Sequence, residues 1–339
     1  MTYVTRRTHS LAEWCAIIDH ELVNNRPIFY NGFTLSISGH AFVCDGADGN
    51  GFYHINWGWS GYSNGYFDIT LLNCDEPETT TGNDGFNYNA GMVIGIKPKT
   101  KEGPAPLVKG KDIITYISSV SLSKKNRNNA EETFQGNVIT DCYNFSHKTF
   151  TGWVALAVKE GDVFKLVSNK SPQISLKAMT MAGEYSGVKN INLSFDHKFP
   201  VGTTKVYLVY GKGENIINTC DKGNENCFYV NATETTADFS NAYKLSATLS
   251  AGELYTGEEN DFTLSISNAG PEDYIDLVFV YISNSETKPT SWNTWFNVTA
   301  PAPGNNGTAT RKISFTPSDI GDFYIWVNDV DGNPIISAQ

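Results

Sequence analysis

Two different periodicities divide the first hundred residues of the chain. In SLAEWCAIIDHELVNN, residues 10–25, apolar side chains recur every three or four positions, and Ser10 and Glu13 have the spacing of a capping box. This stretch predicts an amphipathic helix that ends near Asn24. In residues 26–98 apolar and polar positions alternate in five short segments separated by Gly, Asn and Asp, which predicts a small antiparallel sheet.

From about Lys109 onward the pattern predicts strands only. Seven or eight short alternating segments predict a first β-sandwich, and a second series, which contains the corner-like motif DIGDFYI, predicts an immunoglobulin-like sandwich. KPKTKEGPAP is a proline-punctuated linker. We therefore expect a multidomain chain, mixed α+β and then all-β, with an α+β unit at 1–98, a linker at 99–110, a β-sandwich at 111–240 and an immunoglobulin-like sandwich at 241–339.

Composition and charge narrow the classes of function. The 339 residues are 40% hydrophobic, enough for several cores, and contain no run of eighteen apolar residues, so we expect no membrane span. A net charge of −11 argues against nucleic acid as a partner, because phosphate binding needs a clustered basic surface. The six cysteines are scattered, and only Cys220 and Cys227 are spaced for a local disulfide; two free thiols are the equal alternative.

His40 and Asn56 are the residues whose placement suggests chemistry. They lie in SGHAFVCDGADGNGFYHINWGWSGYSNGYF, residues 38–67. If HAFVC and FYHIN form a hairpin across DGADGNG, a symmetric register pairs His40 with Asn56 and places both on one face with Cys44. Directly opposed Cβ atoms are about 4.5–5.5 Å apart, so the Asn56 oxygen would accept a hydrogen bond from the imidazole and orient it as a general base.

The ordered motif GHAFV, an Asp-Gly turn, and Asn followed at once by Trp-Gly-Trp resembles the streptopain family, papain-like cysteine peptidases of bacteria. The resemblance covers about residues 10–98 and implies that residues 1–98 are the carboxyl-terminal half of a papain-like peptidase domain. It makes His40 the base of a Cys/His pair and Asn56 its orienting partner. It also gives supporting roles to three neighbours: Trp57 as a shield over the Asn-His hydrogen bond, Trp59 beside the substrate cleft, and Gly39 before the histidine.

The nucleophile that this family needs is not evident. The resemblance places it well over a hundred residues before the histidine, whereas 39 residues precede His40. Cys15 lies on the apolar stripe of its helix, Cys44 lies about 13 Å along the strand from His40, and Cys74 stands among carboxylates that would raise its pKa. We therefore expect a cysteine-type peptidase part that is inactive unless an amino-terminal half is supplied. A truncated gene, a processed chain with a separate partner, or a degenerate relative would each produce it.

The alternative function is a non-catalytic protein that binds a cell surface, a glycan or a host protein through its β modules and retains a protease remnant. The expected partners are a protein or peptide substrate, a separate amino-terminal protease half, and a second copy that meets the apolar face of a half-domain. The resemblance implies no metal or organic cofactor and a secreted or cell-surface location, although MTYVTRRTHS has no signal-peptide pattern. A metal site from His40, His54 and a loop aspartate lacks a closely spaced ligand pair.

Overall fold

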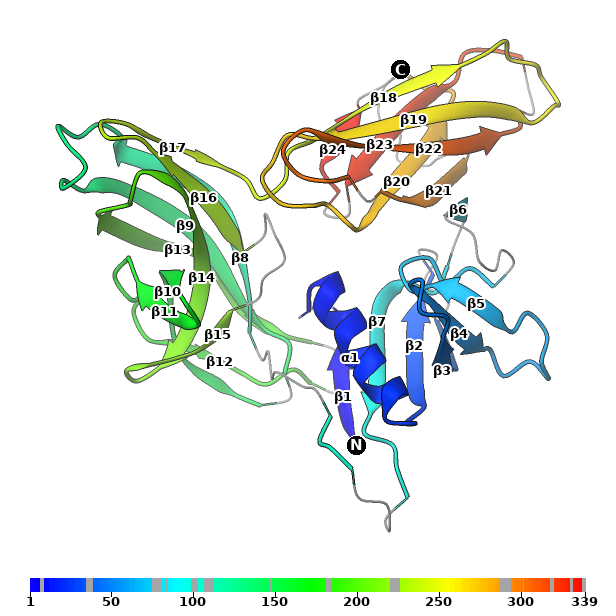
Figure 1. Ribbon diagram of the computed structural model, residues 1–339. Helices are drawn as coiled ribbons and strands as arrows, with labels where there is room; N and C mark the ends of the chain where they lie inside the picture. Colours follow the sequence, from blue (N-terminus) through cyan, green and yellow to red (C-terminus); the bar gives the residue numbers. More distant parts are fainter. Residues whose placement is uncertain are drawn as a thin grey trace. The chain divides into compact units, whose positions relative to one another are not determined.

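The computed structural model describes most of the chain as strands in two compact units (Figure 1). The first unit comprises Met1–Arg7, Leu11–Val108 and Tyr243–Gln339, and the second comprises Thr8–Ser10 and Lys109–Ala242. The residues that the structure describes are 1–6, 9–34, 39–74, 81–82, 85–98, 103–106, 113–146, 148–180, 184–219, 226–286, 294–300, 302–317, 320–329 and 332–336.

The predicted fold class, an α+β papain-like half followed by two all-β modules, is wrong. The described residues form twenty-four strands and a single α-helix, so the part of the chain that the structure describes is nearly all β. The physical reason lies in the periodicity. The 13 residues of α1, Leu11–Val23, have an apolar stripe of helical spacing, whereas the other regular segments that the structure describes pair as strands. The helix itself was predicted at residues 10–25 and is confirmed.

The amino-terminal part of the first unit is a six-stranded antiparallel sheet with the order β1-β7-β2-β3-β4-β5. Its strands are β1 Thr2–Thr5, β2 Ile28–Phe33, β3 Gly39–Ala47, β4 Phe52–Asn56, β5 Gly65–Asp68 and β7 Tyr88–Ile94. Helix α1 buries Trp14, Ile17 and Ile18 in the same core as the buried strand residues. Trp14 Nε1 donates to Tyr30 Oη at 3.0 Å, which fastens the helix to β2.

The carboxyl-terminal part of the first unit has two sheets that share one apolar core. One sheet has the order β18-β19-β22 and the other β24-β23-β20-β21-β6, where β6 comes from the amino-terminal part of the chain. The strands are β6 Thr81–Gly82, β18 Leu245–Ala251, β19 Asn260–Asn268, β20 Leu277–Ser283, β21 Thr294–Thr299, β22 Gly307–Phe315, β23 Tyr324–Asp329 and β24 Pro334–Ile336. An ion pair of 2.9 Å joins Arg6 Nη2 to Asp276 Oδ2.

The second unit also places two sheets on either side of one core. The larger sheet has the order β11-β10-β14-β16-β17, with β12 paired to β10 and β15 to β14, and the smaller has the order β13-β9-β8. The strands are β8 Ile113–Lys124, β9 Phe134–Asn144, β10 Phe150–Glu160, β11 Val163–Leu166, β12 Ile174–Leu176, β13 Ser186–His197, β14 Gly202–Lys212, β15 Asn215–Thr219, β16 Cys227–Ala232 and β17 Ala237–Ser240.

The structure does not test, or tests only in part, three expectations from the sequence. The predicted domain boundaries at 98, 110 and 240 stay predictions. Cys220 lies outside the described residues, so the choice between a Cys220–Cys227 bridge and two free thiols is not addressed; Cys227 itself is buried. Among the helices that the structure describes, none is long and apolar enough to cross a membrane.

Candidate functional site

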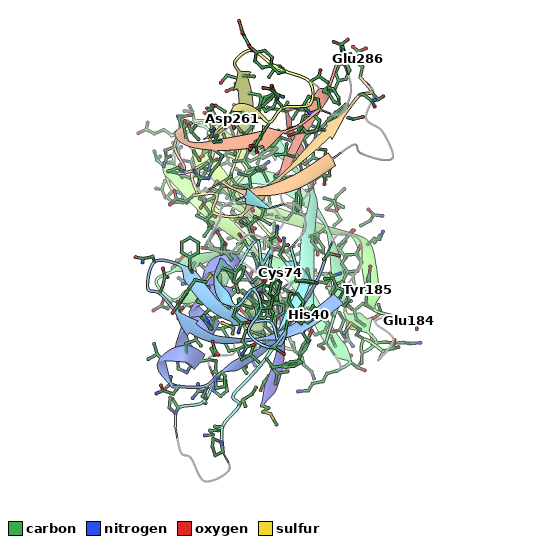
Figure 2. All side chains as sticks on the ribbon, turned by 90° about the vertical axis from the view of Figure 1, so that its right-hand side faces the viewer. His40, Cys74, Glu184, Tyr185, Asp261 and Glu286 are labelled. Atoms are coloured by element: carbon green, nitrogen blue, oxygen red, sulfur yellow. The ribbon has the colours of Figure 1, made fainter. Side chains whose placement is uncertain are left out.

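His40 stands near the start of β3 with four aromatic rings around it, and Figure 2 labels its position. Its ring centroid lies 4.8 Å from that of Trp59, 5.3 Å from Phe86, 6.0 Å from Phe42 and 6.1 Å from Trp57. The two tryptophan rings are stacked on it, at interplanar angles of 26° and 22°. The imidazole is therefore half-buried and held in one orientation.

One hydrogen bond determines which nitrogen of His40 carries the proton. Nε2 lies 2.9 Å from the carbonyl oxygen of Trp57. A carbonyl oxygen can only accept, so Nε2 must be the protonated nitrogen. In the neutral ring Nδ1 then keeps its lone pair, and it has no hydrogen-bond partner among the residues that the structure describes. A neutral ring in this tautomer can accept a proton at Nδ1.

The predicted pairing of His40 with Asn56 is wrong. The register instead pairs Val43 with Asn56 and Cys44 with Ile55, and a bulge separates these pairs from the turn. Cys44 and Ile55 are both fully buried, so Asn56 lies on the opposite face of the sheet from His40 and Cys44.

The turn between the two strands explains the error. Asp48 Oδ1 accepts from the backbone N–H groups of Asn50 and Phe52, at 2.7 and 3.0 Å, and Asp48 N donates to Phe52 O. This Asx-type turn closes the hairpin at Asp48, whereas the symmetric register began the loop at Asp45. Asp45 becomes the extra residue of the bulge between Cys44 and Gly46.

Two asparagines hold the backbone that orients His40. Asn56 Oδ1 accepts from Gly58 N at 3.0 Å, and Asn64 Oδ1 accepts from Trp57 N at 3.0 Å. These bonds fix both peptide groups around Trp57, whose carbonyl contacts the imidazole. Asn56 therefore acts on His40 through the Trp57 peptide. The sequence analysis missed Asn64; its position between Gly61 and Gly65, in a loop that needs side-chain hydrogen bonds to keep its shape, was the available signal.

The supporting residues occupy distinct places. Trp57 is fully buried and stacks on Trp59 at 5.7 Å, so it forms the wall behind the imidazole; no Asn56–His40 bond exists for it to shield. Its Nε1 has no hydrogen-bond partner among the described residues. Trp59 is 38% exposed and Tyr62, in the same loop, is 74% exposed. At Gly39 a Cβ atom would lie 2.7 Å from the Phe33 ring, so a larger residue would displace that ring.

The cysteines of this part of the chain belong to the apolar core of the sheet or pack against it. Burial raises the pKa of the Cys44 thiol to about 12, and the Cys44 side chain is fully buried beside the core. Burial also raises the pKa of Cys15, which packs against the same core. Thiolates are the reactive form, so neither thiol is activated. Cys74 is half-buried and packs against this core as well.

His54 lies on the other face of the sheet from His40. Its Nδ1 is 2.5 Å from Asp45 Oδ1, and both side chains are about a third exposed. Among the described residues there is no group of three or more His, Cys, Asp or Glu side chains that could hold a metal ion. The two histidines therefore have separate surroundings, and only His40 has the aromatic cage and the backbone acceptor.

The amino-terminal part of the chain is similar in sequence to known cysteine peptidases. Residues 1–67 match the Peptidase C10 family. Streptopain of Streptococcus pyogenes is 47% identical over 95 residues, which are 28% of this chain and 24% of streptopain. The thiol protease/hemagglutinin PrtT of Porphyromonas gingivalis is 43% identical over 104 residues, 31% of this chain and 12% of that protein. A transglutaminase structure from red sea bream shares 12% identity, covers 62% of this chain and 28% of that one, and has a TM-score of 0.21, too low to support an argument.

The predicted resemblance to the streptopain family is confirmed: the amino-terminal part of this chain is related to these cysteine peptidases. The matched residues 1–67 contain His40, Asn56 and both tryptophans of the site. The matching region spans about a quarter of streptopain, so the relationship is to one part of a peptidase.

Proposed function

We propose that residues 1–98 are the histidine-bearing part of a streptopain-like cysteine endopeptidase, with β modules appended, and that this part works with a cysteine-bearing segment. The observation that carries the proposal is the His40 ring, held by the Trp57 carbonyl at Nε2 with Nδ1 unpartnered among the described residues. A nucleophilic thiol brought to Nδ1 would complete the pair. The resemblance also supports a secreted or cell-surface location.

The chemistry follows from the tautomer. Nδ1 takes the proton of the incoming thiol, and the thiolate attacks a peptide carbonyl of a protein substrate. The resulting imidazolium donates from Nε2 to the Trp57 carbonyl oxygen, 2.9 Å away, and so keeps its orientation. The proton then passes from Nδ1 to the leaving amine. The Trp57 and Trp59 rings exclude water from one side of the imidazole.

This proposal predicts that the chain alone does not hydrolyse peptides, because Cys15 and Cys44 are buried thiols of raised pKa. Co-expression with the cysteine-bearing segment of S. pyogenes streptopain should produce turnover of a fluorogenic casein that iodoacetamide blocks. Turnover is compared for the chain alone, the segment alone and the pair. Iodoacetamide-sensitive turnover by the chain alone would refute the prediction that it lacks a nucleophile. A pair that associates but remains inactive would count against the peptidase proposal.

The solvent face of the six-stranded sheet carries an apolar row that supports the proposed self-association. Tyr3 pairs with Val93, Val93 with Phe29, and Phe29 with Val43 across four strands, so the four side chains share one face. Tyr3 is 56% exposed and Phe29 46% exposed. A contiguous apolar face of this kind is typical of an interaction surface.

Self-association through this face is expected in sedimentation at micromolar concentration. Phe29→Glu should shift the equilibrium toward monomer by at least about tenfold, because a carboxylate would have to be desolvated in the contact. The matched control is Val23→Glu on α1, which replaces an 80% exposed apolar residue away from this row. A wild-type chain that sediments as a monomer throughout would contradict the expectation.

The alternative function, binding without catalysis, has one observation in its favour. The second unit presents a polar groove and an exposed aromatic cluster on a single sheet face, described below. If no cysteine-bearing segment activates the chain and this face binds a ligand, the binding function becomes the better account.

A further inference from the structure

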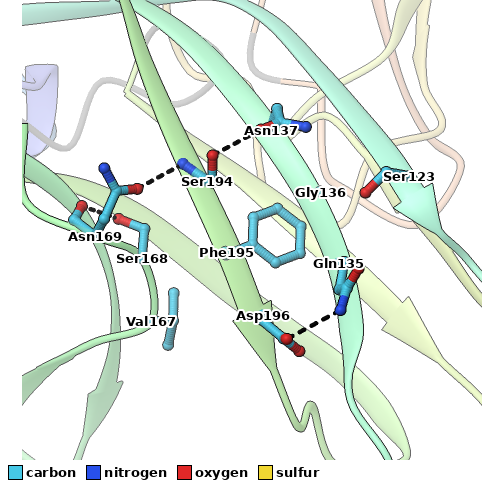
Figure 3. Close-up of a pocket in the computed structure, with 10 residues that line it drawn as sticks. All are labelled: Ser123, Gln135, Gly136, Asn137, Val167, Ser168, Asn169, Ser194, Phe195 and Asp196. Carbon is cyan, nitrogen blue, oxygen red and sulfur yellow. Dashed lines mark hydrogen bonds between the residues drawn. The ribbon is translucent and has the colours of Figure 1, made fainter.

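The outer face of the β13-β9-β8 sheet contains a groove with a volume of about 520 Å³ (Figure 3). Its polar lining includes Ser123, Gln135, Asn137, Asn169, Ser194 and Asp196. On β9 the buried positions Gly136 and Val138 alternate with the half-buried Gln135 and Asn137. The polar side chains therefore point away from the core that the two sheets share.

Hydrogen bonds hold the polar side chains of the groove in place, as Figure 3 shows. Ser194 Oγ donates to Asn137 Oδ1 at 2.8 Å, and Ser194 N donates to Asn169 Oδ1 at 2.7 Å. Gln135 Nε2 donates to Asp196 Oδ2 at 2.9 Å. These side chains are preorganised, which reduces the entropy that a ligand must lose to order them.

The same bonds leave hydrogen-bonding capacity unused. The Asn137 amide nitrogen, the Gln135 side-chain oxygen, the second Asp196 oxygen and the Ser123 hydroxyl have no hydrogen-bond partner among the residues that the structure describes. Unused donors and acceptors thus line the same groove. A ligand that carries many hydroxyl groups, each both donor and acceptor, can pair with both kinds.

The charge of the lining excludes other ligand classes. Among the described residues that line the groove there is no Lys, Arg or His, and the single charged side chain is Asp196, so an anionic ligand would meet no cation there. Its apolar members, Phe195 and Val167, are only 3% and 7% exposed, so the groove offers no apolar wall to a hydrophobic ligand. The lining therefore selects for neutral, polar ligands.

An aromatic cluster lies further along the same sheet. The rings of Phe145 and Tyr185 are 4.4 Å apart, and Tyr143 lies 5.9 Å from Tyr185 and 5.8 Å from Tyr116. Tyr185 is 51% exposed, and Figure 2 labels it beside Glu184. Tyr143 follows Asn137 by six positions on β9 and shares its face, so the cluster lies about 20 Å from the groove along the strand.

We infer that this face, from the groove to the aromatic cluster, binds a neutral oligosaccharide. The amides and Asp196 bind hydroxyl groups of one sugar. The Tyr185 ring packs against the apolar face of another sugar ring of the same oligosaccharide. The separation of about 20 Å requires several linked sugars rather than one. The inference concerns the second unit alone and does not depend on the peptidase proposal.

The test uses the full chain on an array of immobilised glycans in three groups: neutral, sialylated and sulfated. We expect retention of one or more neutral oligosaccharides, and titration calorimetry with the retained sugar should give saturable binding. Asn137→Ala and Tyr185→Ala should each weaken the affinity at least tenfold. The matched control, Phe239→Ala, removes a 37% exposed ring from β17 in the other sheet and should leave the affinity unchanged.

Two outcomes would overturn the inference. One is an array on which no neutral glycan is retained, whether nothing binds or only the charged groups bind. The other is neutral-glycan binding that both variants retain at full affinity, which would place the site elsewhere. Melting temperatures of the variants identify any loss of fold.

Discussion

If the chain is reconstituted with a cysteine-bearing segment as proposed, we expect His40→Ala to lower kcat by about 10⁴-fold or more, because the thiol would lose the base that ionises it and the acid that protonates the leaving amine. Nothing else in the described surroundings replaces that base: the other contacts of the ring are aromatic rings and a backbone carbonyl. The matched control is His54→Ala, which removes a histidine from the other face of the same sheet and should change kcat by less than about twofold.

The measurement is single-turnover cleavage of a peptide ester, which separates acylation from product release. Loss of activity in both variants to the same extent would mean that the sheet, and not the imidazole, had been damaged. A His40→Ala enzyme that keeps iodoacetamide-sensitive activity within tenfold of wild type would remove His40 from the mechanism.

Asn56 variants distinguish the observed geometry from the predicted one. The observed bond runs from Gly58 N to Asn56 Oδ1, so Asn56→Asp keeps the acceptor and should keep kcat within a few fold. Asn56→Leu loses the acceptor, frees the peptide after Trp57 and should cost about 10²-fold. A direct contact with the imidazole would instead make Asn56→Asp shift the pH profile, because a carboxylate beside the ring stabilises the imidazolium.

Local sequence patterns predicted the elements that depend on near neighbours. The apolar stripe predicted α1, and the ordered motifs GHAFV and NWGW singled out His40 through the resemblance to the streptopain family. Local sequence patterns could not predict the register between β3 and β4. One Asx-type turn at Asp48 and one bulge at Asp45 moved Asn56 to the opposite face, and each depends on hydrogen bonds that the apolar pattern does not show.

Features that combine distant segments of the chain could not be predicted from the sequence either, for a different reason. The acceptor for His40 is a backbone carbonyl, which every residue has, so no residue type at Trp57 could indicate it. The groove in the second unit combines the strand pairing of β9 and β13 with the segment around Asn169. The fold class failed because one helix was taken as evidence for an α+β unit, whereas strand pairing decides the architecture of every other described segment.

Arg26→Met is expected to destabilise the first unit by about 3–5 kcal/mol, because it leaves a buried carboxylate without its counter-ion. Arg26 Nη2 and Nε donate to the two oxygens of Glu21 at 2.6 and 2.8 Å, and the two side chains are 3% and 0% exposed. Glu21 also accepts from Gly95 N at 2.8 Å, and Arg26 Nη1 donates to Pro104 O at 3.0 Å. The pair therefore fastens the end of α1 to the segment after β7.

This pair also makes stability depend on pH, with a sign that can be worked out. Burial opposes ionisation of Glu21, but the hydrogen bonds from Arg26 and Gly95 outweigh it and lower the pKa of Glu21 below its usual 4.5. The unfolded state therefore binds the proton more tightly, and the contribution of Glu21 is complete above about pH 4.5. It is lost as the pH falls through the lowered pKa of the folded state. Wild type should thus lose stability on acidification, and Glu21→Gln should lose less.

Hydrogen exchange of the α1 amides, measured at pH 7 and in a series that continues well below pH 4.5, reports the opening free energy of this unit without interference from the second. The double variant Glu21→Leu/Arg26→Met removes both charges and should recover part of the stability that Arg26→Met loses, because no unpaired charge remains buried. If the double variant is less stable than Arg26→Met by the full cost of a second independent loss, the two side chains do not act as a pair, and the carboxylate must draw its stabilisation from the Gly95 amide instead.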